Sequence, residues 1–127
     1  MPNDDEVSAL VRETMSDFTD AIRTGNFSML YEKASTDFQS TYTEDQTKEV
    51  FHEFIAKKSL VVPILEKTNS FEAQFDPRPS IRKEKGLDIL VANGKYDTKP
   101  LPVRFEYEYV KRDGEWKMLK LVVQLTK

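Results

Sequence analysis

The chain contains no cysteine, a single histidine and only four glycines in 127 residues. Without cysteine it can form no disulfide, no thiol nucleophile and no cysteine-based zinc site. The one histidine, His52, has no cysteine partners for a structural zinc ion, and no ligand spacing motif surrounds it. We therefore predict no metal and no other cofactor.

A strong charge excess and a long apolar run are also missing. The net charge is −3 and the basic residues are scattered, which argues against nucleic-acid binding. No run of 18 apolar residues exists, so we predict no membrane insertion. The first six residues do not resemble a signal peptide. The compartment stays open between the cytoplasm and export with a leader absent from this sequence.

Bulky core material is nevertheless abundant, with eight Phe, five Tyr and one Trp. The hydrophobic fraction is 39% and the charged fraction 32%, so we assign the polar residues to surface and loops. We see no repeat, low-complexity segment or linker, and the length suits one domain over residues 1–127.

Apolar residues recur at helical spacing in three segments of the first half. These are about Asp4–Thr24, about Phe27–Ala34, and a stretch from the Thr43–Gln46 capping box to about Lys57. Asn3 or Asp4 can cap the first helix, and Gly25 suits the position after its end. We expect residues 35–42 to form a connection. Pro63 should leave residues 60–65 as an irregular segment, a sheet edge or one short helical turn.

The second half predicts an antiparallel sheet of about four strands. The expected strands are Ser70–Phe75, Leu87–Tyr96, Val103–Lys111 and Glu115–Leu125. Two prolines in residues 76–79 should end the first strand. Residues 82–85 are expected to form a charged loop.

The register of the last hairpin has two alternatives. A two-residue turn at Asp113-Gly114 would pair Glu106 with Leu121 and so set a carboxylate beside an aliphatic side chain. A three-residue loop with a bulge at Gly114 would instead pair apolar residues: Val103 with Val123, Phe105 with Leu121, and Tyr107 with Leu119. It would also set Glu106 opposite Lys120. We choose the three-residue loop, because several matched cross-strand pairs should determine the register.

That register gives the sheet an aromatic and aliphatic inner face and a mixed outer face. The outer face would carry Arg104, Glu106, Glu108 and Lys120 beside an apolar group. The members of that group are our candidates for a dimer interface: Val110, Trp116, Met118 and Val122. Coverage of this patch by the chain's own loops is an equal alternative.

The order of elements and the motifs of the last third resemble the nuclear transport factor 2-like (SnoaL-like, cystatin-like cone) superfamily. The motifs are Gly94-x-Tyr96, Val-x-Phe105-x-x-x-Tyr109 and Gly114-x-Trp116-Lys-x-x-x-Leu121. The resemblance implies an α+β cone in which three N-terminal helices pack on a bent antiparallel sheet. It also implies an internal pocket and dimerisation through the outer face of the sheet. Since this fold serves many functions, it carries little weight for the activity.

Aromatic residues at core phase are packing or pocket-lining side chains. Buried tyrosine hydroxyls need a hydrogen-bond partner, which a ligand or water inside a cone would supply. Our pocket candidates on this basis are Tyr31, Phe38, Tyr42, Phe54, Tyr96, Phe105 and Tyr107.

Catalysis is the weaker interpretation. Isomerases with this fold use a carboxylate base that faces a tyrosine in an apolar cavity, but no acidic residue here has a clear inward phase. Asp17 and Asp20 flank the apolar face of the first helix, and Glu106 and Glu108 point outward in the chosen register. His52 lies beside an apolar stripe and not within it, so we expect a surface or half-buried role and assign no catalytic residue.

We therefore expect a non-catalytic domain that binds a small apolar or amphipathic ligand or a protein partner, and that forms a homodimer. The alternative is a small cofactor-independent isomerase or dehydratase of the ketosteroid isomerase-like type. A third interpretation is a structural module whose cone is solid.

Overall fold

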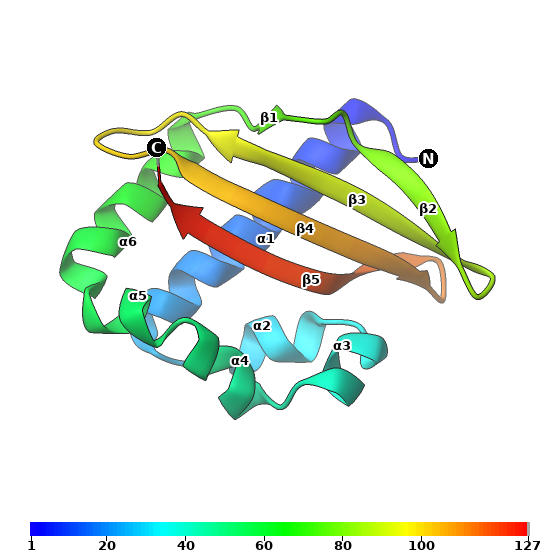
Figure 1. Ribbon diagram of the computed structural model, residues 1–127, viewed down its shortest axis with the longest axis horizontal. Helices are drawn as coiled ribbons and strands as arrows, with labels where there is room; N and C mark the ends of the chain where they lie inside the picture. The colour runs from blue at the N-terminus through cyan, green and yellow to red at the C-terminus, as the bar shows by residue number, and fades with distance from the viewer. Residues whose placement is uncertain (127) are drawn as a thin grey trace.

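The computed structural model describes residues 1–126, in which helices precede the sheet and pack against one of its faces (Figure 1). The helices are α1 (Asp4–Thr24), α2 (Ser28–Lys33), α3 (Thr36–Thr41), α4 (Glu44–Val50), α5 (His52–Ala56), α6 (Lys58–Lys67) and the 3-10 helix η1 (Thr68–Ser70). The strands are β1 (Gln74–Phe75), β2 (Ser80–Glu84), β3 (Leu87–Tyr96), β4 (Val103–Arg112) and β5 (Glu115–Leu125). The α+β class is as predicted, whereas the specific cone fold stays a prediction.

The first helix has the predicted bounds because signals at both ends are local. Asn3 is the cap: its side chain accepts a hydrogen bond from the Glu6 N–H at 2.8 Å, and Glu6 accepts one from the Asn3 N–H at 3.1 Å. At the other end Gly25 has a φ of 75° and donates to the Ala21 carbonyl at 2.8 Å. In Figure 1 this helix runs behind the sheet.

The described residues contain more helices than the three predicted. Residues 35–42 are not a plain connection, because Ser35 caps α3 by accepting a hydrogen bond from the Phe38 N–H at 3.0 Å. The predicted third helix begins at its Thr43 capping box but breaks at Phe51, where α4 gives way to α5. The prediction for residues 60–65 was also wrong, since α6 continues through Pro63. Its buried Val61, Val62 and Leu65 pack in the core, and this burial outweighs the hydrogen bond that proline removes.

The sheet has five strands, not four, in the order β1-β3-β4-β5 with β2 also paired to β3. The expected first strand shrinks to the two residues of β1. The expected charged loop is largely β2, which a two-residue turn joins to β3. Lys85 and Gly86 form that turn with φ values of 50° and 79°, as a type I′ hairpin requires. The bounds of β3 and β5 match the prediction, and β4 ends one residue later.

The predicted register of the last hairpin was wrong. Asp113 and Gly114 have φ values of 53° and 79° and form a two-residue turn, so that Arg112 pairs with Glu115. A bulge then leaves Leu119 without a partner on β4. Beyond the bulge the pairs are Tyr107 with Leu121, Phe105 with Val123 and Val103 with Leu125.

The bulge explains which predicted faces are right. Our register differs from the observed one by two residues beyond Leu119, so Leu121 and Val123 do face inward and Val122 outward. Between the turn and the bulge the difference is one residue, which reverses the faces. Trp116 and Met118 therefore lie on the inner face, where both pack against the core.

The core lies between α1 and the inner face of β3, β4 and β5. Its largest fully buried side chains are aromatic or aliphatic and come from both layers, among them Phe18, Ile22, Tyr96, Phe105, Tyr107 and Tyr109. None of the helices in residues 1–126 combines the length and apolar character that crossing a lipid bilayer requires.

Candidate functional site

The aromatic residues that we predicted to line one pocket do not lie together. Tyr96, Phe105 and Tyr107 fill the space between α1 and the sheet, with exposed fractions of 1%, 2% and 0%. Their rings pack in sequence, with centroids 5.5 Å apart for Tyr96 and Phe105 and 4.8 Å apart for Phe105 and Tyr107. These three side chains are therefore core packing.

The other four candidates lie around the helices that follow α1. Phe38 and Tyr42 line an apolar groove of about 230 Å³ between α4 and β5, and Phe54 lines a neighbouring groove of about 380 Å³. The Tyr31 hydroxyl donates to the Tyr42 carbonyl at 2.6 Å and lies outside both grooves. The structure thus brings Phe38 and Tyr42 together but does not unite the seven residues in one chamber.

Two of the buried tyrosine hydroxyls, those of Tyr107 and Tyr109, have their partners inside the protein. Tyr109 and Thr14 share a hydrogen bond of 2.7 Å, and the Tyr107 hydroxyl lies 3.8 Å from the Met15 sulfur. Burial raises the pKa of both tyrosines above the ordinary value near 10. Both hydroxyls are therefore neutral near pH 7, and neither bonds to a carboxylate of residues 1–126.

His52 lies on the surface, as expected. Its side chain is 64% exposed, and its Nδ1 lies 2.9 Å from the Glu49 carbonyl oxygen. Within residues 1–126 no group of three or more His, Asp or Glu side chains is placed to hold a metal ion.

The proposed dimer patch does not exist as one surface. Trp116 and Met118 face α1 and α2, where they line a small cavity of about 40 Å³ with Leu30 and Tyr109. Val110 is on the outer face, but it is only 1% exposed. Val122 alone keeps the predicted outward position with partial exposure. Dimerisation itself stays a prediction.

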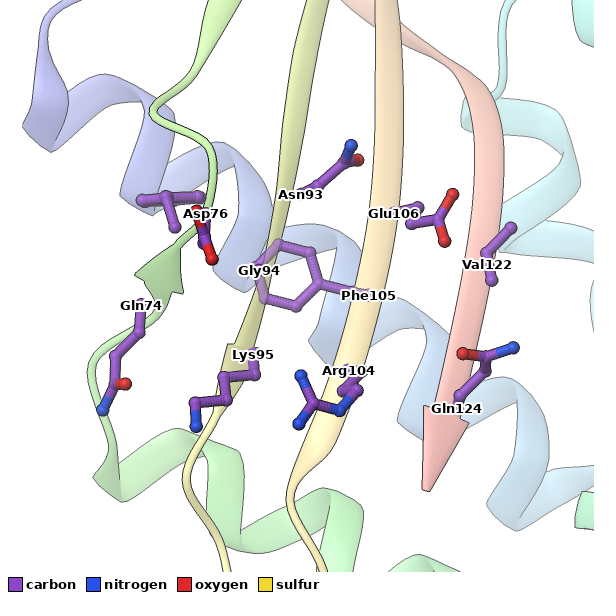
Figure 2. A pocket seen from close by; sticks show the side chains of 11 residues that line it. Gln74, Asp76, Asn93, Gly94, Lys95, Arg104, Phe105, Glu106, Val122 and Gln124 are labelled. Atoms are coloured by element: carbon purple, nitrogen blue, oxygen red, sulfur yellow. The ribbon is translucent and has the colours of Figure 1, made fainter. Parts of the chain in front are cut away.

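The outer face of the sheet instead carries a hollow of about 470 Å³, which we call the outer hollow. Figure 2 shows its side chains in front of the sheet, with α1 behind. Polar and charged side chains from four strands and the residue after β1 form most of it: Gln74, Asp76, Asn93, Lys95, Arg104, Glu106 and Gln124. Val122 adds apolar surface, whereas the Phe105 side chain, although next to the hollow, is only 2% exposed and packs in the core.

One row of paired residues crosses the outer hollow with two cations at its centre. Gln74 pairs with Lys95, Lys95 with Arg104, and Arg104 with Gln124. Lys95 and Arg104 are half-buried, and neither forms an ion pair with any of residues 1–126. Like charges directly opposite each other in an antiparallel pair are destabilising. We call these four residues the cationic row.

The adjoining row carries acceptors. Asn93 pairs with Glu106. Each lies two residues from the cation of its own strand, so these side chains are on the same face of the sheet as Lys95 and Arg104. The Asn93 side-chain oxygen is buried and has no hydrogen-bond partner in residues 1–126. Glu106 accepts a hydrogen bond from Lys120 at 3.1 Å through one oxygen. Asp76 lines the same end of the hollow, and its N–H donates to the Asn93 carbonyl at 3.0 Å. We call Asp76, Asn93 and Glu106 the acceptor row.

Gly94 allows β1 to close one side of the outer hollow. A Cβ atom at this position would lie 2.2 Å from the Gln74 carbonyl oxygen, so only glycine lets β1 approach β3 this closely. Sequence reasoning placed Arg104 and Glu106 on the outer face but missed Gln74, Asn93 and Lys95. The alternation of β3 was the available signal, because Asn93 and Lys95 alternate with the buried Ala92 and Tyr96.

Neither a family model nor a curated protein sequence matches this chain. The resemblance to the nuclear transport factor 2-like superfamily therefore stays a prediction that rests on the order of elements and on the motifs in residues 94–121. Any assignment of function depends on the geometry of the outer hollow and the grooves.

Proposed function

We propose that this chain is a non-catalytic binding domain that holds a small amphipathic anion in the outer hollow. The observation that carries the proposal is the pair of half-buried cations, Lys95 and Arg104, directly opposite each other without a carboxylate partner in residues 1–126. An anion between them would replace their repulsion with two charge-assisted hydrogen bonds.

The surroundings suit a ligand that is anionic at one end and apolar elsewhere. Gln74 and Gln124 flank the cations and can donate amide hydrogen bonds to the same anion. Val122 offers apolar surface in the same hollow. This combination of a few polar groups with apolar contact is usual for small-molecule sites.

The isomerase alternative gains no support from a specific contact. The hydroxyls of Tyr31, Tyr107 and Tyr109 bond to a backbone carbonyl, a thioether and Thr14, respectively. A base facing one of them would be needed for that chemistry.

The homodimer expectation concerns the same face of the sheet. A dimer formed through this face would cover the outer hollow, because Val122 lines the hollow. Sedimentation at micromolar concentration with and without the ligand probe separates the two uses of the face. A wild-type monomer that binds the probe would set the dimer aside.

Hexanoate is a suitable probe for the proposed function, with the uncharged alcohol 1-hexanol as the control of the same chain length. We expect saturable amide shift changes confined to residues 74–76, 93–95, 104–106 and 122–124. Replacing Arg104 or Lys95 by glutamine should weaken hexanoate binding about tenfold or more, because a hydrogen bond to a charged group contributes about 1.5–3 kcal/mol.

Lys117→Gln is the matched control, since Lys117 is on the same face of β5 but outside the hollow. It removes the same charge and should leave binding unchanged. Equal weakening of hexanoate binding by all three variants would show that the net charge of the protein, and not a site in the hollow, causes the effect. No saturable change with hexanoate would refute the proposal.

A further inference from the structure

The geometry points to a dipolar ligand, an amino carboxylic acid whose carboxylate meets the cationic row and whose ammonium group meets the acceptor row. This inference rests on the proposed function, because it takes the anion site at Lys95 and Arg104 as given. It adds the second half of the ligand and the distance between its two charged ends.

The first step is the spacing of the two rows. Asn93 and Lys95 are two residues apart on β3, and Glu106 and Arg104 are two residues apart on β4. Alternate residues of a strand share a face, and two residues span about 7 Å. The outer hollow therefore presents positive charge and hydrogen-bond acceptors about one strand repeat, roughly 7 Å, apart.

The second step is that acceptor atoms of the acceptor row lack hydrogen-bond donors. The Asn93 side-chain oxygen is buried without a donor, and such a group costs about 1–3 kcal/mol when nothing satisfies it. Glu106 gives one oxygen to Lys120 and retains the other. Asp76 forms no ion pair with residues 1–126. An ammonium group has three donors and a positive charge, and it matches these three acceptors.

The third step is that the two rows do not neutralise each other directly. No ion pair within 4.0 Å joins Lys95 or Arg104 to Asp76 or Glu106, although all four side chains line one hollow. Figure 2 shows Lys95 and Arg104 at one end and Asn93 and Glu106 at the other, on the same two neighbouring strands. A ligand with charges of both signs would bridge the rows.

The chain length of the ligand follows from this spacing. The carboxylate and the ammonium nitrogen should be separated by an extended methylene chain of roughly 7 Å, because side chains stand roughly perpendicular to a sheet and so keep the spacing of the two rows. 5-Aminopentanoate has this shape. Its methylenes would lie over Val122, which supplies partly exposed apolar surface in the hollow.

Calorimetric titration with 5-aminopentanoate and with pentanoate tests the inference. We expect 5-aminopentanoate to bind at least tenfold more tightly, because its ammonium group gains hydrogen bonds to charged and buried acceptors. Glu106→Gln and Asn93→Leu should each reduce that advantage several-fold and leave pentanoate binding no weaker. Arg104→Gln should weaken both ligands. Far-ultraviolet circular dichroism verifies that each variant is folded.

Glu108→Gln is the matched control for Glu106→Gln. Glu108 is on the same face of β4 and loses the same charge, but it pairs with Arg82 outside the hollow. Equal affinity for the two ligands would overturn the dipolar inference while pentanoate binding still supported the anion site. Binding of neither ligand would overturn both. An advantage for 5-aminopentanoate that survives both acceptor variants would also overturn the inference.

Discussion

Replacement of Gly94 by alanine should destabilise the protein and open one side of the outer hollow. The new Cβ atom would lie 2.2 Å from the Gln74 carbonyl oxygen and 3.0 Å from the Phe75 Cα atom. Carbon and oxygen atoms in adjacent strands are normally at least about 3.3 Å apart, so the backbone of β1 must move by about 1 Å. Because β1 has only two paired residues, we expect it to detach from β3 before the longer strands distort.

Two opposing effects determine the size of the loss. Overpacking typically costs about 1–3 kcal/mol. Gly94 does not have a left-handed backbone conformation, so alanine would otherwise stabilise the fold by about 0.4–1 kcal/mol through the unfolded state. The net decrease in the free energy of unfolding should be about 1–2 kcal/mol, which lowers the urea midpoint by roughly 0.5–1 M at a typical m-value.

Urea unfolding followed by the fluorescence of Trp116, the single tryptophan, measures this change. Amide chemical shifts of Gln74 and Phe75 report whether β1 has moved. Gly86→Ala is an informative contrast, because Gly86 has a φ of 79° and no atom near its Cβ position. Its cost would come from the backbone alone and would leave the β1 shifts unchanged. A Gly94→Ala protein as stable as the wild type, with unshifted β1 amides, would refute the reasoning.

Two further predictions concern stability alone. Burial raises the pKa of Tyr107 and Tyr109 in the folded state, so above about pH 10 the unfolded chain loses these protons first. The free energy of unfolding should then fall by about 1.4 kcal/mol per pH unit for each tyrosine. Tyr109→Phe should remove one such contribution. Urea midpoints that stay constant from about pH 9 to 11 would contradict this prediction. Asn3→Ala should cost about 1 kcal/mol in urea unfolding because it removes the α1 cap, whereas Asn3→Gly should cost only a few tenths; equal losses would show that the side-chain cap is not the cause.

Features governed by neighbouring residues could be predicted from the sequence. The bounds of α1 follow from Asn3 and Gly25, which act on backbone groups within one helical turn. The capping box at Thr43 and Gln46 likewise forms as predicted. The α+β class follows from apolar periodicity that changes from helical to alternating along the chain.

Features governed by distant contacts could not be predicted in the same way. Pro63 indicated an interruption, but the burial of α6 against other elements keeps the segment helical. The short β2 looked like a charged loop because Arg82, Lys83 and Glu84 are charged and none of its five residues is fully buried. The outer hollow combines residues that are distant in the sequence and close in space. That Lys95 and Arg104 lie opposite each other can be recognised only once the β3–β4 register is known.

The bulge at Leu119 depends both on neighbouring residues and on distant contacts. The Asp113-Gly114 turn alone would continue a register in which Tyr107 meets Lys120 and Phe105 meets Val122, which would turn Lys120, Val122 and Gln124 toward the core. One extra residue satisfies both the local turn and the distant apolar pattern. It puts Leu121, Val123 and Leu125 against the core, where an apolar side chain contributes about 1.5–3 kcal/mol when fully buried.

The same extra residue builds part of the candidate site. It turns Val122 and Gln124 outward to the hollow and leaves Lys120 within 3.1 Å of Glu106. The bulge therefore puts Gln124 into the cationic row. It also places Lys120, the cation that Glu106 contacts, beside the acceptor row. Core packing and ligand chemistry thus depend on a single irregularity of β5, so a change of register there would disturb both.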